Sequence, residues 1–96
     1  MVTLYQAEWC PHSSRVRQRF TELGVSFVAV PVPADKVERE EMRGKTGTDE
    51  IPALLLDDGT AIAGEADDII AFLDANHTER ADAAEYRRQA EEHGAA

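Results

Sequence analysis

The chain changes character at Cys10 and Pro11. An apolar run from Val2 precedes this pair, and the helical spacing of Val16 and Phe20 follows it. Proline suits the first position of a helix, because no amide hydrogen is needed there. The cysteine then occupies the N-cap, where unpaired amides and the positive helix end favour a thiolate over a thiol. We therefore predict a strand, a nucleophilic cysteine and a helix in immediate succession.

The remaining elements alternate along the chain. Val25 begins a β-branched run, Asp58 and Gly59 signal a hairpin turn, and Ile69 and Leu73 lie on one helix face. We predict strands over residues 2–6, 25–32, 51–56 and 61–63, and helices over 11–23, 34–43, after 64–67, and over 78–93. This order predicts an α/β fold, β-α-β-α-β-β-α, with a four-stranded mixed sheet and an extra C-terminal helix. One domain over residues 1–96 is expected, with its core at 2–76.

Composition narrows the possible environments and partners. The 96 residues include one cysteine, so no internal disulfide is possible, and the formal net charge is −9. This charge disfavours binding to nucleic acid and to anionic membranes. We see neither a cationic leader with an apolar stretch nor a run long enough to span a membrane, and we expect a monomer in the cytoplasm.

Three motifs in order resemble the glutaredoxin family. They are the run from Cys10 to Ser13 after the first strand, Ile51 with Pro52 before the third, and residues 64–68 before the last core helix. The resemblance covers roughly residues 2–76 and implies a thioredoxin-like fold. It also implies a thiol-linked redox function.

The resemblance implies a role for each residue of the first motif. Cys10 would be the nucleophile, and Pro11 would begin its helix. Ser13 stands where dithiol members have a resolving cysteine, and a hydroxyl cannot close a disulfide. The expected cycle is therefore monothiol, with an external low-molecular-weight thiol completing it.

The second motif contributes a wall of the thiol site through the same resemblance. Pro52 matches a proline that follows a cis peptide bond and faces the active cysteine. The amide and carbonyl of Ile51 would then pair with the backbone of a bound thiol, as an added strand does. The alternative interpretation is a proline that opens an edge strand.

The third motif matches the turn that holds the γ-glutamyl end of glutathione. Amides of Ala66 and Asp67 at a helix N-terminus would bind the α-carboxylate, and the Asp67 carboxylate would receive the ammonium group. Glu65 is a second candidate for the ammonium, because the region also resembles the N-terminal domain of glutathione transferases. Ordinary helix capping by acidic residues explains the same pattern equally well.

The chain departs from the family where the glycine carboxylate of glutathione is held. Ala7 replaces a basic residue, and Asp49 and Glu50 stand where a basic or amide residue is usual. Acidic groups would repel that carboxylate. We therefore expect glutathione or a related γ-glutamyl thiol as co-substrate, with γ-glutamylcysteine favoured over glutathione.

Other polar and aromatic residues flank the cysteine. His12 is expected to point outward, and Trp9 would either cover the thiol or pack in a loop. Cys10 and His12 fall short of the four ligands of structural zinc, so no metal is expected. The arginines of the first helix, Arg15 among them, form either a solvated face or an aid in holding an anionic thiol.

The predicted function is a monothiol thiol-disulfide oxidoreductase that acts on mixed disulfides between proteins and a γ-glutamyl thiol. One alternative is an iron-sulfur cluster carrier, in which Cys10 of two chains and two small thiols hold the cluster. Another is a non-catalytic binding module similar to a transferase N-terminal domain. For that module, the chain after Asn76 is too short to form a transferase's second, all-helical domain.

Overall fold

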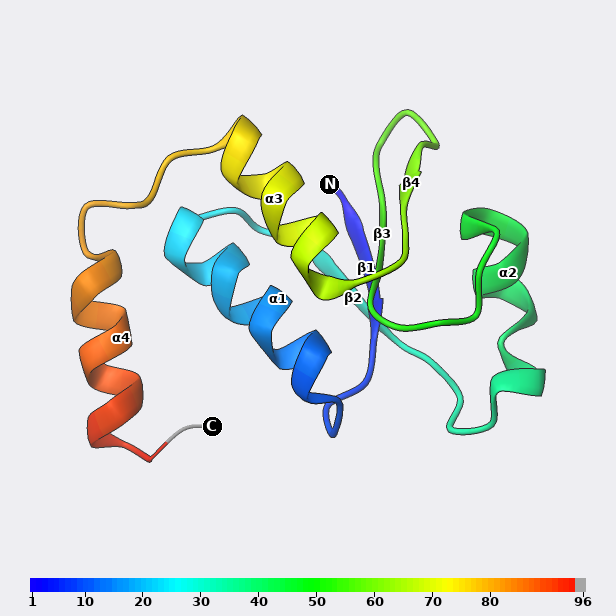
Figure 1. Cartoon of the computed structure of the whole chain (residues 1–96), viewed down its shortest axis with the longest axis horizontal. Coiled ribbons are helices and arrows are strands. Elements are labelled where there is room, and N and C mark those ends of the chain that lie inside the picture. The colour runs from blue at the N-terminus through cyan, green and yellow to red at the C-terminus, as the bar shows by residue number, and fades with distance from the viewer. Residues whose placement is uncertain (95–96) are drawn as a thin grey trace.

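The computed structural model describes residues 1–94 and shows a four-stranded mixed sheet with helices on both faces (Figure 1). The strands lie in the order β2-β1-β3-β4, with β1 and β2 parallel and the other pairs antiparallel. Their bounds are Thr3–Gln6 for β1, Val28–Pro31 for β2, Ala53–Leu55 for β3 and Ala61–Ile62 for β4. The predicted thioredoxin-like fold class is confirmed. The last two residues of the predicted domain, 95 and 96, lie outside the described part.

The helices are unequally packed on the sheet. Their bounds are Pro11–Leu23 for α1, Glu40–Thr46 for α2, Ala66–Asn76 for α3 and Ala83–Glu92 for α4, with a 3-10 turn, η1, at Lys36–Glu38. Leu4 and Leu54 enter the larger core with α1 and α3, whereas their neighbours Tyr5 and Ala53 pack with Met42 of α2. Successive strand residues point to opposite faces, so α1 and α3 cover one face and α2 the other. No helix within residues 1–94 is long and apolar enough to cross a membrane.

The single helix predicted over residues 34–43 is wrong. Its first part is the 3-10 turn η1, the backbone departs from helical geometry at Arg39 (φ −85°, ψ 47°), and α2 then runs to Thr46. Gly44 lies inside α2, and Gly47 ends it with a φ of 80° that favours glycine. At this break the Arg39 side chain donates to the carbonyls of Pro33, Ala34 and Asp49, contacts that helix propensity does not include.

Other predicted boundaries shift at the edges of the fold. Strand β2 is shorter than the predicted range 25–32 and includes Pro31, which an edge strand tolerates. Strand β3 starts two residues after Ile51, and β4 lacks Ala63. The predicted C-terminal helix over 78–93 begins only at Ala83, and in the segment before it the Arg80 amide donates to the Glu22 carbonyl of α1. Helix α4 then packs beside α1 on the side away from the sheet (Figure 1).

Candidate thiol site

Cys10 is the N-cap of α1, as predicted. Its backbone is extended (φ −82°, ψ 118°), Pro11 begins the helix, and the Ser13 amide donates to the Cys10 Sγ at 3.4 Å. The first turn of α1 contains no acidic residue, so nothing there competes for the positive helix end. Cys10 is only 5% exposed, and Ser13 is fully buried. The sulfur is therefore held in one orientation by the structure beneath it.

Several contacts act on the protonation of this sulfur. Burial alone raises the pKa of the Cys10 thiol, but hydrogen bonds from the Ser13 hydroxyl, the Ser13 amide and the His12 amide, together with the Arg17 charge, lower it below its ordinary value. The Ser13 hydroxyl accepts from the Ala7 amide at 3.4 Å, which leaves its hydrogen for the sulfur. A larger share of Cys10 is thus in the thiolate form at neutral pH than of an ordinary thiol.

A cleft of about 270 Å³ adjoins the start of α1. It is lined by residues from all three predicted motifs or their neighbours: His12, Arg15, Ile51, Pro52 and residues 64–67. Pro52 is fully buried, and its peptide bond to Ile51 is cis. Cys10 itself lines a separate groove of about 350 Å³ with Trp9, which is 69% exposed.

The far side of the cleft is the start of α3. Glu65 is the N-cap, and a capping box joins it to Asp68. Ala66 is buried, whereas Asp67 is exposed and forms an ion pair with Arg15. The capping interpretation therefore holds for Glu65 and Asp68, while Asp67 lines the cleft together with Arg15. Sequence reasoning noticed Arg15 only as part of a cationic helix and did not foresee this pairing.

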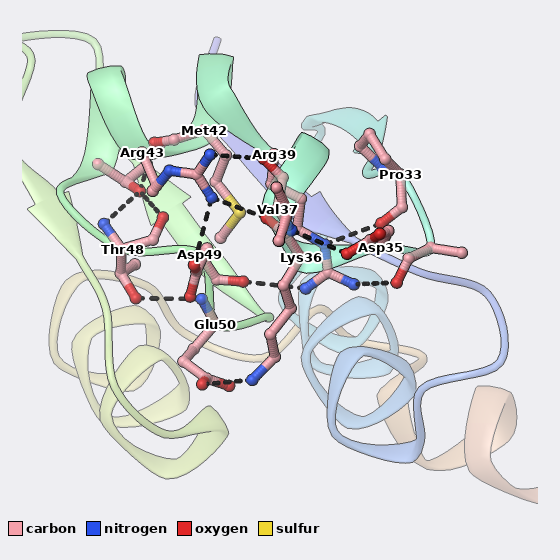
Figure 2. A network of polar contacts seen from close by, with 12 residues as sticks. Pro33, Asp35, Lys36, Val37, Arg39, Met42, Arg43, Thr48, Asp49 and Glu50 are labelled. Carbon is pink, nitrogen blue, oxygen red and sulfur yellow. Dashed lines mark hydrogen bonds and ion pairs between the residues drawn. The ribbon is translucent and has the colours of Figure 1, made fainter.

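The acidic loop before Ile51 is not a bare negative patch. Asp49 forms an ion pair with Arg43 at 3.3 Å, and Glu50 forms one with Lys36 at 2.6 Å (Figure 2). Both cations come from residues 34–43, which the sequence predicted to form one helix. The repulsion expected for a substrate carboxylate is therefore partly offset by these cations. The sequence alone does not reveal this offset, because each ion pair joins residues of two different segments.

The other arginines of α1 have partners within the molecule. Arg17 bonds to Gln6, and Arg19 forms ion pairs with Glu22, Asp74 and Glu79. They therefore belong mainly to the protein's own ion-pair network, rather than to an open cationic face. Within the described range 1–94, no group of three His, Cys, Asp or Glu side chains is arranged to hold a metal ion.

Comparison with known proteins shows which families the chain resembles. Residues 4–81 match the family model of the glutathione S-transferase N-terminal domain. Glutaredoxin 3 of Escherichia coli strain K12 is 34% identical over 74 residues, which are 77% of this chain and 86% of that protein. The chain belongs to the glutaredoxin family. A glutaredoxin-like 8.6 kDa protein of Clostridium pasteurianum is 31% identical over 67% of this chain and 84% of its own length.

Solved structures show that this glutaredoxin-like chain is similar in fold to part of the glutathione transferases. A glutathione S-transferase domain-containing protein of Marinobacter aquaeolei has a TM-score of 0.67 and 32% identity, over 79% of this chain and 38% of its own. A Sulfitobacter transferase homologue with bound glutathione has a TM-score of 0.68 at 23% identity, over 78% and 36%. The chain thus spans well under half the length of these structures. A coarse assignment to thiol-disulfide exchange or glutathione-type thiol binding is supported.

Proposed function

We propose that this chain is a monothiol thiol-disulfide oxidoreductase that acts on mixed disulfides between proteins and a γ-glutamyl thiol. One observation carries the proposal: Cys10 has a lowered pKa and starts the helix that borders the cleft between Ile51, Pro52 and residues 64–67. Membership of the glutaredoxin family supports the reaction type. A cytoplasmic location remains a prediction.

The exchange proceeds in two balanced steps. The Cys10 thiolate attacks the small-thiol sulfur of the mixed disulfide; a new disulfide forms between them, and the target protein leaves as a thiolate that takes up a proton. The thiolate of a second small-thiol molecule then attacks the small-thiol sulfur of this disulfide. That step frees the Cys10 thiolate and releases the oxidised small thiol. Ser13 supplies no sulfur, so the second small thiol is required.

The cleft suggests how the small thiol is recognised. The amides at the start of α3 suit an α-carboxylate, and the Asp67 carboxylate suits the neighbouring ammonium group. Backbone groups of Ile51 would pair with the cysteinyl part of the thiol. The charges of Glu50 and Asp49 are offset by Lys36 and Arg43. We therefore propose both glutathione and γ-glutamylcysteine as substrates. The preference for γ-glutamylcysteine should be smaller than the two acidic residues by themselves would give.

The test uses the whole chain and its Cys10→Ser variant. Each is mixed with a protein disulfide-bonded to glutathione or to γ-glutamylcysteine, plus the matching free thiol, and loss of the adduct is followed by mass spectrometry. We expect catalysed loss with the parent and none above background with the variant. Thiol binding without any catalysed loss would contradict the enzyme and support the non-catalytic module, which the transferase-domain match also favours. Visible absorbance and dimerisation after cluster reconstitution would support the iron-sulfur carrier.

A further inference from the structure

Arg39 is a buried cation that bonds to the backbone of two separate segments. Its residue is 3% exposed, and it lies at the joint between η1 and α2. Nε donates to the Pro33 carbonyl at 2.8 Å, Nη1 to the Asp49 carbonyl at 2.9 Å, and Nη2 to the Ala34 carbonyl at 3.3 Å (Figure 2). A buried guanidinium is costly unless its donors are satisfied, so these bonds fix Arg39 and the carbonyls alike.

One of these carbonyls belongs to the loop that enters the thiol cleft. Asp49 is two residues before Ile51, which with Pro52 lines that cleft. The other two carbonyls belong to the chain that leaves β2. Arg39 therefore connects the loop that precedes the cleft wall to the segment that follows β2. Exposed contacts, such as the pair between Lys36 and Glu50, brace the same loop from outside.

We propose that Arg39 is a positioning residue for thiol recognition: it sets the place of Ile51 and Pro52 in the cleft without touching the thiol. This inference rests on the proposed function. The physical basis is that the buried Arg39 guanidinium bonds to the backbone of the loop. The ion pairs of Asp49 and Glu50 are partly or largely exposed, so they contribute little to the stability of the loop. Cys10 is held by α1 and is independent of this bond set.

The decisive variant is Arg39→Met, which keeps the length and apolar stem but removes every donor. Arg39→Lys retains the charge with fewer donor directions. The matched control is Lys45→Met, because it makes the same kind of change at an exposed cation of α2 that pairs with Glu41 instead of a backbone carbonyl. Steady-state constants and the Cys10 alkylation rate are measured well below each melting temperature.

We expect Arg39→Met to raise KM for the γ-glutamyl thiol about tenfold while the Cys10 alkylation rate stays at the parent value. The KM of Arg39→Lys should fall between those of the parent and Arg39→Met, and Lys45→Met should stay close to the parent. A folded Arg39→Met variant with parental KM overturns the proposal. Equal losses in KM, kcat and alkylation rate also overturn it, because they indicate a general loss of structure.

A second readout does not depend on turnover. Amide hydrogen exchange over residues 47–51 should accelerate in Arg39→Met and not in Lys45→Met, and parental exchange in Arg39→Met overturns the proposal. If the parent protein itself shows no Cys10-dependent turnover, the proposed function fails, and the exchange result still decides what Arg39 does to the loop. Where Arg39→Met does not fold, Arg39→Lys decides in the same way: parental KM and exchange overturn the proposal.

Discussion

Two helix N-termini border the thiol site, and they are built in opposite ways. At α1 the cap is the buried Cys10, and the first turn has no acidic residue. At α3 the cap is the exposed Glu65, and Asp67 and Asp68 add two more carboxylates in the first turn. The positive end of the α1 dipole therefore acts on the Cys10 sulfur, whereas the start of α3 offers amides and carboxylates to the charged end of the proposed substrate. Reactivity and recognition should respond to different substitutions.

Ser13→Ala should give the largest change in reactivity with the least change in recognition. Removing this hydroxyl deletes a hydrogen bond to the thiolate, so the pKa of Cys10 should rise and its alkylation rate at pH 7 should fall about tenfold. KM for the thiol should change little, because Ser13 does not line the cleft. Alkylation by iodoacetamide as a function of pH measures the effect. An unchanged midpoint would show that the hydroxyl does not support the thiolate.

The next effect belongs to the other helix. Asp67→Asn removes the charge that would receive the ammonium group, so KM for a γ-glutamyl thiol should rise about fivefold to tenfold. The Cys10 alkylation profile should not move. Asp74→Asn is the matched control, since Asp74 is another exposed carboxylate of α3, far from its start. Equal KM values for the two variants would remove Asp67 from recognition.

The pH dependence of stability tests the α1 end alone. The folded-state pKa of Cys10 is lowered, so its thiolate stabilises the fold most above the unfolded value of about 8.5, and this contribution is lost as pH falls through the folded pKa. The free energy of unfolding of the parent, relative to Cys10→Ser, should therefore rise with pH across that window. Urea unfolding at several pH values measures it, and a difference that declines with pH would contradict the lowered pKa.

The smallest effect concerns the link between the two helix ends. Arg15→Gln breaks an ion pair with Asp67 whose side chains are both largely exposed, so the loss of stability should be under about 1 kcal/mol. Thermal unfolding in dilute buffer measures the loss, and added salt should reduce it further. A loss of several kcal/mol would mean that the two helix ends depend on each other for folding.

Sequence reasoning was accurate where structure depends on neighbours in the chain. Pro11 and Gly24 mark the ends of α1 by their own backbone preferences, and Cys10 was predicted as its cap. The cleft residues Pro52 and Asp67 were found only through a family resemblance, because nothing local indicates that they meet. Their roles in thiol binding remain predictions.

What the sequence could not supply is which distant groups satisfy one another. Arg15 meets Asp67 across 52 residues, and Arg39 meets the Asp49 carbonyl across 10. The sequence does not show which charged side chains have partners in the fold. Residues 34–43 were therefore predicted as one helix from local propensity alone.

The sequence by itself determined that Cys10 caps the start of a helix, because capping and the helix dipole act within a few residues of that position. Only the tertiary structure decided that the acidic loop is offset by cations and that Arg39 holds the Asp49 carbonyl beside the cleft. The reason is physical: burial and long-range hydrogen bonds exist only once the sheet has brought β2, α2 and the loop before β3 together.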